Sequence, residues 1–451
     1  MMDYDVIFIG SGHANWHAAV TLKQAGKSVA IVEEDTLAGT CTNYGCDAKI
    51  LLDGPFELVD QLHQYDKLGV EVNTKINWSQ MMAYKHQVID PLSVQMGMLF
   101  KQMGIDILMG HGSLLDGHTV QVADQRYTAT NIVLGTGQRP ASLPVDGSDF
   151  IHDSREFLDL EEMPNHLTFV GAGIISLEFA SMAAMLGSAV TVVEFGDRAL
   201  GAFNQEHVQQ LVKKLESAGV NFLFNEGLAS VSKNDDDTFT AKTTAGTEIK
   251  TDYVLGATGR IPNVENLGLE TVGIDFNKRG IVVNDHLQTT VDSIYASGDV
   301  IDKNIARLTP TATFESNYIA GQILGINGAA IDYPVIPSVV FTMPRLAQAG
   351  VTVAEANENP EKYHVQAVPY GKRLAFQYKN ELDADLELIF DKENYLVGAE
   401  ISGNDAPDLI NILVMIINQH MSANDLGKQI FAFPSSSVGV IDLLSMSLHR
   451  N

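Results

Sequence analysis

Short apolar runs, glycine turns and helical stretches follow one another near the start of the chain. Residues 5–9 form one apolar run, which meets Gly10-Ser11-Gly12, a helical stretch over 14–25 and a second run over 28–32. The second run ends at Glu33. This order of strand, glycine turn, helix, strand and acid predicts a dinucleotide-binding unit, because glycines let the backbone approach a pyrophosphate and the acid binds a ribose hydroxyl. Asn15 occupies the third glycine position, where close packing of helix on strand favours a small residue.

The same pattern occurs a second time. A run over 167–170 enters Gly171-Ala172-Gly173, a helical stretch follows from Ile174 to residue 186, and a run over 189–193 ends at Glu194. Ser176 stands at the third glycine position of this copy. Two such units in one chain predict two bound dinucleotides, which is a far more specific signal than one copy.

The acid of the second unit bears on the choice of nucleotide. A carboxylate accepts hydrogen bonds from a free ribose 2′-hydroxyl and repels a 2′-phosphate. Glu194 therefore favours NADH over NADPH. The alternative interpretation of Glu194 is a solvated acid at the end of a strand.

The remaining sequence predicts further strands and helices around these units. We expect a helical region over 77–103, a β-meander over 110–130, and three apolar strands over 132–134, 253–256 and 294–296, the first two entering glycine turns and the last ending near Asp299. From about residue 333 the pattern changes to strands without glycine turns, followed by an amphipathic helix over 406–420. This last part predicts a separate lobe without a nucleotide site.

Composition and charge narrow the class of protein. A chain of 451 residues is too long for one core, and 45% apolar residues with 38 glycines indicate a folded, turn-rich α/β protein. The formal charge of −27 disfavours nucleic acid and anionic membrane surfaces as partners. No apolar run reaches about 18 residues, and the chain starts directly into a strand without a basic segment and cleavage site. We therefore expect a soluble, cytoplasmic protein.

The chain has only two cysteines, and both lie in the stretch Gly-Thr-Cys-Thr-Asn-Tyr-Gly-Cys over residues 39–46. In one continuous helix Cys41 and Cys46 would lie about 8 to 9 Å apart at Cα, whereas a disulfide spans at most about 7 Å. We therefore expect Cys41 to lie off the helix, a bend over 42–45, and a helix that begins near Cys46. A helix N-terminus lowers the pKa of a nearby thiol, which makes Cys46 the favoured thiolate.

Three interpretations of the cysteine pair remain open at this point. A reversible catalytic or redox-sensing disulfide fits a reducing compartment. A zinc site is weakly supported because no further cysteine and no clustered histidine complete four ligands. Two inert buried thiols are the third interpretation.

The order of these parts resembles the class I pyridine nucleotide-disulfide oxidoreductases, the flavoprotein family of glutathione reductase and dihydrolipoamide dehydrogenase. The likeness covers nearly the whole chain. The motifs that carry it are the cysteine stretch over 39–46, Glu178-Phe179-Ala180, the run 257–263, Tyr295-Ala296 with Gly298-Asp299, and Pro337 to Thr342. The fold that this resemblance implies has two Rossmann-like domains, for FAD and NAD, and an α+β C-terminal dimerisation domain.

The resemblance also implies domain limits and residue roles. The FAD-binding domain would span residues 1–150, the NAD(P)-binding domain 151–262, a segment returning to the FAD domain 263–332, and the dimerisation domain 333–451. Cys46 would face the flavin, Cys41 would attack substrate, and Lys49 with Glu178 would be the catalytic ion pair near the flavin. The residues expected to bind FAD are Gly10, Ser11, Gly12, Glu33, Gly39, Thr40, Gly112, Thr136, Gly137 and Asp299, and those expected to bind NAD are Gly171, Gly173, Ile174, Glu194 and Gly259.

Two departures from the family pattern stand out. Disulfide-reducing relatives end in His-Pro-x-x-x-Glu, whose histidine serves the thiols as acid and base, but this chain has Phe433 and Val438 at those positions. His420 and His449 are near in sequence, although a lone histidine is more often an ordinary surface residue. Relatives also place a lysine four residues beyond the second cysteine, whereas here Lys49 comes one position earlier. Asp47 beside Cys46 opposes a low thiol pKa.

The sequence therefore predicts a homodimeric FAD enzyme that uses NADH to reduce a small disulfide or related sulfur oxidant through Cys41 and Cys46. Two alternatives remain: a reductase of another acceptor, such as hypothiocyanous acid, a quinone, a metal ion or oxygen, and a flavin-bound redox sensor. No metal cofactor is expected. The pH dependence is expected to follow the thiols rather than a group near the histidine reference pKa of about 6.5.

Overall fold

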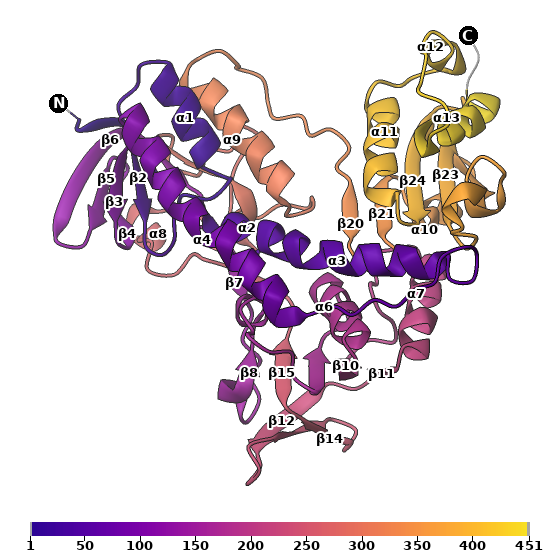
Figure 1. Cartoon of the computed structure of the whole chain (residues 1–451). Coiled ribbons are helices and arrows are strands. Elements are labelled where there is room, and N and C mark those ends of the chain that lie inside the picture. The colour runs from indigo at the N-terminus through magenta and orange to yellow at the C-terminus, as the bar shows by residue number, and fades with distance from the viewer. Residues whose placement is uncertain (1, 449–451) are drawn as a thin grey trace.

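The computed structural model describes residues 2–448, which form three lobes around one long central helix (Figure 1). The first lobe is built on a sheet in the order β3-β2-β1-β6-β5-β4, with β19 paired to β6. Strands β3, β2, β1, β6 and β19 run parallel, and β4 to β6 form an antiparallel meander. The strands are β1 (Tyr4–Ile9), β2 (Val29–Glu33), β3 (Asp106–Met109), β4 (Gly112–Asp116), β5 (Thr119–Val122), β6 (Gln125–Leu134) and β19 (Ile294–Ala296).

Helices α1 (Trp16–Gln24) and α9 (Thr309–Ile323) lie side by side in this lobe (Figure 1). The backbone N–H of Ala18 in α1 donates to Ser316 Oγ in α9 over 3.0 Å. Strand β1 is apolar at every position from Val6 to Ile9 and is buried there, which is typical of a central parallel strand covered on both faces. The chain thus returns after residue 262 to complete its first lobe.

The second lobe has a sheet in the order β11-β10-β9-β15-β8, whose strands all run parallel. Its helix α6 (Ile174–Met185) is buried at every position from Ser176 to Ala183, because the helix is apolar on nearly all sides. A small antiparallel sheet β12-β13-β14 covers this lobe. The strands are β8 (Ile151–His152), β9 (His166–Val170), β10 (Ala189–Glu194), β11 (Val220–Phe224), β12 (Leu228–Lys233), β13 (Phe239–Thr243), β14 (Glu248–Thr251) and β15 (Tyr253–Gly256), and α7 spans Gln205–Ser217.

The third lobe is an antiparallel sheet in the order β20-β21-β24-β23-β22, with α11 packed against β21 and β24. A core of its own, including Leu386, Leu388, Leu409 and Leu413, lies between the sheet and the helices. The elements are β20 (Ser338–Val340), β21 (Leu346–Gly350), α10 (Val353–Glu358), β22 (Tyr363–Val368), β23 (Asp385–Asp391), β24 (Leu396–Ser402), α11 (Ala406–Asn418), α12 (Ala423–Leu426) and α13 (Ser436–Ser447).

Helix α3 (Cys46–Gln64) runs across the middle of the molecule between the lobes (Figure 1). It contacts α6 of the second lobe, and its Asp53 forms a fully buried ion pair with Arg345 of the third. The preceding α2 spans Gly39–Tyr44, and α4 (Trp78–Met103) packs beside both helices. The remaining short elements are β7 (Gln138–Pro140), α5 (Ser154–Phe157), β16 (Arg260–Pro262), α8 (Leu269–Val272), β17 (Phe276–Asn277), β18 (Gly280–Ile281) and four 3₁₀ turns at Ser148–Phe150, Gly298–Val300, Tyr370–Lys372 and Gln377–Lys379.

The predicted α/β class with two Rossmann-like units and an α+β C-terminal lobe is confirmed. The helix expected over 77–103 is α4, and the two helices of the nucleotide units are present but shorter than expected. As expected, Cys41 lies off helix α3, which begins at Cys46, but the bend expected over 42–45 is wrong. Cys41 lies in its own short helix α2, and the break between the two helices is confined to Gly45.

Candidate active site

A cavity of about 830 Å³ opens beside the first nucleotide unit. Its size falls in the range of about 300–1,000 Å³ that is usual for ligand and cofactor sites. The cavity wall contains both cysteines and all ten residues predicted to bind FAD, which come from six separate parts of the chain: Gly10, Ser11, Gly12, Glu33, Gly39, Thr40, Gly112, Thr136, Gly137 and Asp299. The fold therefore brings the predicted set together.

The glycine turn after β1 has the backbone that a nucleotide site needs. Gly10 has φ +96°, and a Cβ there would lie 2.5 Å from the carbonyl oxygen of Gly135, so that only glycine fits. Around Gly12 and Gly137, in contrast, a Cβ would meet nothing within 4 Å. Both of these glycines line the cavity, which leaves their backbone open to an approaching phosphate group.

Glu33 closes the first unit at the end of β2. Its Oε2 accepts hydrogen bonds from Ser11 N over 2.9 Å and from Ser11 Oγ over 2.6 Å, and its Oε1 accepts from Asp35 N over 3.0 Å. These bonds hold the carboxylate at the cavity wall beside the glycine turn. The residues present thus fit the adenosine end of FAD, with glycines for the pyrophosphate and a fixed carboxylate for a ribose.

Asn15, the departure at the third glycine position, is fully buried. Its Nδ2 donates to the carbonyl oxygens of Ile9 and Gly10 over 2.8 Å each. A Cβ on Gly135 would lie 2.5 Å from the Asn15 side chain. Gly135, directly after strand β6, therefore supplies the space that the larger Asn15 requires at the start of α1.

The two cysteines face the same cavity across the break between α2 and α3. Gly45 is required at the break, because a Cβ there would lie 2.8 Å from the carbonyl oxygen of Thr40. Cys41 is half-buried and Cys46 is exposed at the cavity wall. The two thiols share a hydrogen bond, and Thr309 Oγ1 lies 3.5 Å from Cys46 Sγ.

The local field separates the two thiols. The hydrogen bond from Cys41 lowers the pKa of Cys46 to about 6, with help from Thr309 and the positive charge of Lys49 and against burial and the charge of Asp47. The pKa of Cys41 is raised, because its proton is shared with Cys46 and because the thiol is buried. Asp47 opposes a low pKa of Cys46, as the sequence indicates, but the hydrogen bonds and Lys49 outweigh this effect. Cys46 is the thiolate near neutral pH, and Cys41 holds the proton.

Lys49 reaches Glu178 despite its earlier position in the sequence. Its Nζ lies 3.3 Å from both carboxylate oxygens of Glu178, and it also stands 3.6 Å from the centre of the Phe341 ring. Glu178 is almost fully buried and accepts a second bond from Phe341 N over 2.7 Å. Burial raises the pKa of Glu178. The ion pair connects the cysteine-bearing helix α3 to α6 of the second lobe.

Several residues at this site were not identified as site residues from the sequence. His13 lines the cavity, its Nδ1 lies 3.1 Å from His17 Nε2, and it is close enough to Asp47 for the two charges to interact. Burial lowers the pKa of both histidines, that of His17 to about 4. Thr309 is another such residue. The contacts of Thr309 with Cys46 and of His13 with Asp47 join segments far apart in the chain, so no local spacing in the sequence indicates them.

The second nucleotide unit repeats the first turn but lies outside this cavity. Gly171 has φ +98°, and around Gly173 a Cβ would meet nothing within 4 Å. Glu194 Oε2 accepts from Ala172 N and its Oε1 from Gly196 N, both over 2.6 Å. Ile174 begins α6 and is partly exposed, and Gly259 has φ +140° in the turn after β15. The five predicted NAD residues thus lie around one sheet edge.

The positions of the family's acid–base pair lie in the third lobe. Phe433 is 81% exposed, so most of its ring is left uncovered by the residues that the structure describes. Val438 is half-buried on α13. His420 stacks on the ring of Tyr395, with ring centres 3.6 Å apart, and does not line the cavity. His449 lies outside the described residues.

Comparisons with known proteins agree with this geometry. Residues 4–316 match the family described as pyridine nucleotide-disulphide oxidoreductase, and residues 336–441 match its dimerisation domain. The chain belongs to this family. The resemblance of the sequence to class I members is thereby confirmed, the family is FAD-dependent with pyridine nucleotide use, and the dimerisation domain indicates a homodimer.

Individual relatives span nearly the whole chain. The dihydrolipoyl dehydrogenase of Bacillus subtilis is 33% identical over 446 residues, covering 96% of this chain and 94% of that protein, and the one from Geobacillus stearothermophilus is 32% identical over 448 residues with the same coverage. Among solved structures, the HOCl-induced flavoprotein disulfide reductase RclA from Escherichia coli superimposes with a TM-score of 0.88 at 27% identity, covering 98% of this chain and 100% of that chain. These relatives support a general disulfide oxidoreductase role.

Among the described residues, no helix has both the length and the apolar character needed to cross a lipid bilayer.

Proposed function

We propose that this chain is an NADH-dependent flavoprotein that reduces a small disulfide or related sulfur oxidant through Cys41 and Cys46. The observation that carries the proposal is the pair of hydrogen-bonded thiols in the wall of the cavity that contains all the residues predicted to bind FAD. FAD bound in this cavity would supply two-electron transfer from the reduced nicotinamide to the cysteine pair. The protein's own residues hold the nucleotides and carry out the sulfur chemistry.

In the proposed reaction, the Cys41 thiolate attacks one sulfur of the substrate disulfide. A Cys41–substrate bond forms, the substrate S–S bond breaks, and the leaving thiolate takes the proton that Cys46 accepted from Cys41, so that Cys46 is a thiolate again. Cys46 then attacks Cys41 Sγ, which forms the Cys41–Cys46 disulfide and releases the second substrate thiolate, and this thiolate takes a proton from solvent. The two electrons that the substrate gains are those lost by the dithiol, and NADH replaces them.

The first step requires a base, because Cys41 holds the proton in the resting dithiol. In relatives a histidine serves the thiols, but Phe433 stands at that position here. We propose that the Cys46 thiolate, which already accepts the hydrogen bond of Cys41, takes this proton. Thr309 would then donate to whichever sulfur carries the charge. Such a relay needs no histidine.

NADH rather than NADPH is proposed as the electron donor. The Glu194 carboxylate is held in place by two backbone N–H groups, where it can accept a hydrogen bond from a free ribose 2′-hydroxyl and repel a 2′-phosphate.

We further propose a cytoplasmic homodimer joined through residues 333–451. The division at residues 150, 262 and 332 stays a prediction, supported by the return of β19 (Ile294–Ala296) to the first sheet.

A second candidate is a reductase of an acceptor other than a disulfide, such as hypothiocyanous acid, a quinone, a metal ion or oxygen. The exposed Phe433 favours it, because an apolar ring cannot protonate a leaving thiolate. The structural relative RclA was also solved as a complex with Cu(II), with a TM-score of 0.88. The redox-sensor alternative is weakened, since Lys49 contacts Glu178 despite its earlier position and the ion pair is therefore not lost.

An acceptor screen with the Cys41→Ser variant tests the proposal. Wild-type protein and NADH are mixed with one acceptor in each reaction. The acceptors are oxidised glutathione, lipoamide, coenzyme A disulfide, hypothiocyanite, Cu(II), a quinone and oxygen. We expect reduction of at least one disulfide, and a loss of about 10³-fold or more in Cys41→Ser, as expected for removal of a nucleophile. Cys46→Ser serves as the matched variant. A disulfide-reducing activity that survives in Cys41→Ser, or activity with quinone or oxygen alone, would contradict the proposal.

A further inference from the structure

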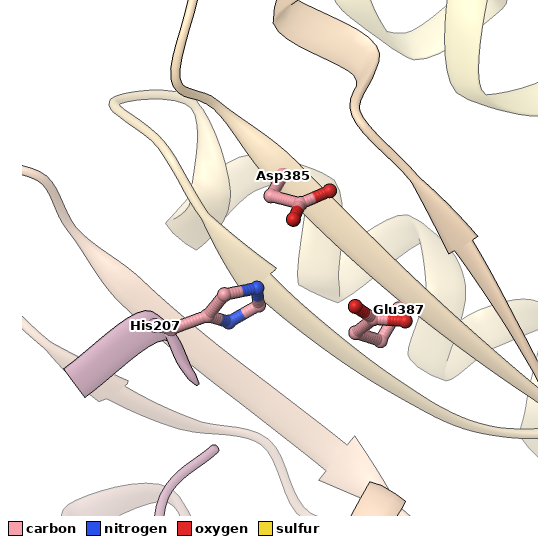
Figure 2. Close-up of side chains that lie close together, drawn as sticks. All are labelled: His207, Asp385 and Glu387. Carbon is pink, nitrogen blue, oxygen red and sulfur yellow. The ribbon is translucent and has the colours of Figure 1, made fainter. Parts of the chain in front are cut away.

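A second cluster of ionisable side chains lies where the second and third lobes meet, apart from the cavity. His207 comes from α7, and Asp385 and Glu387 come from β23. One ligand atom from each lies within 4.8 Å of the other two. Figure 2 shows the imidazole ring directed toward the two carboxylates. Asp385 and Glu387 are two positions apart on one strand, so both point to the same face of the sheet.

The His207 side chain is buried without a partner for its outer nitrogen. The residue is 2% exposed, and its Nε2 has no hydrogen-bond partner in the described part of the chain. Such an unsatisfied buried group carries a stability cost. A ligand at this nitrogen would remove the cost.

The carboxylates of the cluster carry negative charge that no lysine or arginine balances. Glu400 lies directly opposite Glu387 on β24, and both are buried. Within residues 2–448, no ion pair joins Asp385, Glu387 or Glu400 to a basic side chain. The site therefore attracts a cation.

We propose that His207, Asp385 and Glu387 form a binding site for a divalent transition-metal ion of the zinc type. One imidazole nitrogen and two carboxylate oxygens suit zinc, whereas magnesium and calcium prefer oxygen ligands alone. Bonds of about 2.1 Å place two ligands of one ion at most about 4.2 Å apart, so the three side chains need only a small inward rotation. Asp385 is half-buried, which gives solvent access to a fourth position.

The bound ion would link two lobes. His207 belongs to the helix that follows the second nucleotide unit, whereas both carboxylates belong to the C-terminal sheet. The same junction already has a hydrogen bond from Asn204 Nδ2 to Glu400 Oε2 over 2.7 Å. Because the unfolded chain does not hold these three groups together, an ion bound here stabilises the folded protein. The proposal does not depend on the acceptor that the enzyme reduces.

Titration calorimetry with zinc chloride tests the site in the flavin-loaded protein. The Cys41→Ser/Cys46→Ser background is used, because the two thiols could otherwise bind zinc themselves. We expect one zinc ion per chain and a rise in melting temperature on zinc addition. His207→Gln and Glu387→Gln should each weaken zinc binding at least about tenfold and abolish the thermal shift. Asp383→Asn, an exposed acid just before β23, is the matched control and should change neither.

Absence of zinc binding, or undiminished affinity in both His207→Gln and Glu387→Gln, would overturn the proposal. Flavin content and circular dichroism establish that each variant is folded. X-ray absorption at the zinc edge of the unmutated cluster provides a second measurement that needs no cluster variant: a shell of one imidazole with oxygens supports the site, and a shell without imidazole overturns it. Binding of magnesium in preference to zinc would also overturn it.

Discussion

The two nucleotide units have nearly the same turn but different surroundings. Gly10 and Gly171 have φ +96° and +98°, and Glu33 and Glu194 each accept a bond from the amide after that glycine, over 2.9 and 2.6 Å. Beside the first turn, α2 approaches so closely that a Cβ on Gly39 would lie 3.0 Å from the Cα of Gly12. Beside the second turn lie the exposed side chains Ile174 and Phe195.

This difference in surroundings assigns different roles to the two turns. An enclosed turn suits a cofactor that stays bound, and an open turn suits one that enters and leaves with each cycle. The thiols lie only beside the enclosed turn, on the helices that close it. A repeated binding unit thus acquires two roles from the segments packed against it.

The largest effects are expected from valine at the open glycine of each turn. A Cβ at Gly12 or Gly173 would meet no protein atom within 4 Å, so valine should leave the fold intact and occupy nucleotide space instead. Gly12→Val should lose its flavin, with absorbance per chain falling about tenfold or more, together with all activity. Gly173→Val should keep its flavin and raise the KM for NADH about tenfold or more. If Gly12→Val kept its flavin with a raised KM for NADH and Gly173→Val lost its flavin, the roles of the two units would be exchanged.

A smaller effect is expected where the units meet. Lys49→Met leaves the buried Glu178 carboxylate without its counter-charge, which should cost about 3 kcal/mol and lower the melting temperature by several degrees. The Lys49→Met/Glu178→Gln double variant should recover part of this loss. Lys214→Met, which breaks the more exposed pair with Asp60, is the control and should cost about 1 kcal/mol or less. Equal losses of stability in Lys49→Met and Lys214→Met would show that the Lys49–Glu178 pair is not structurally important.

The acid of the second unit should control cofactor choice. Glu194→Ser removes the charge that repels a 2′-phosphate, so kcat/KM for NADPH relative to NADH should rise about tenfold. Asp197→Asn, an exposed acid in the same loop, should leave the ratio unchanged. Steady-state rates with both nucleotides measure the ratio of kcat/KM for NADPH to kcat/KM for NADH. A ratio unaffected by Glu194→Ser would place cofactor discrimination elsewhere.

The smallest effect concerns the thiolate beside the first unit. Alkylation of the reduced protein by iodoacetamide should follow a titration with a midpoint near pH 6, because the Cys46 thiolate is populated above its pKa of about 6 and protonated below it. Thr309→Val removes a hydrogen bond and should move the midpoint upward by up to about one unit. Cys46→Ser should abolish the transition. A midpoint unchanged near pH 9 would contradict the assignment of Cys46 as the thiolate.

This pKa changes how a pH profile is interpreted. The sequence suggests that an inflection near 6.5 would indicate a histidine, but Cys46 titrates in the same range. The variants of Cys46 and Thr309 distinguish the two. Sulfur chemistry can therefore imitate a histidine dependence in this site.

Local features of the sequence predicted the fold and much of the cavity. Continuous apolar strands, glycine turns and terminal acids are set by neighbouring residues, so both units could be predicted from their order, whereas the full set of ten cavity residues came from the family resemblance. Three other features depend on how distant helices pack: the reach of Lys49 to Glu178, the hydroxyl of Thr309 near Cys46, and the approach of His13 to Asp47. No spacing within one segment contains that information. The short helix around Cys41 was missed because its six residues are too few for a helical pattern.

Helix α3 has one more consequence, for exchange of segments between related genes. Its Lys49 and Asp53 find their counter-charges, Glu178 and Arg345, in regions far along the chain. A fragment that ends before those regions would contain the charges of Lys49 and Asp53 without their partners. A chimera that replaces only the helix, or only the partner regions, would contain mismatched charges. Viable recombinants should therefore exchange the helix together with both distant partners, as a set that is inherited jointly although it is scattered through the gene.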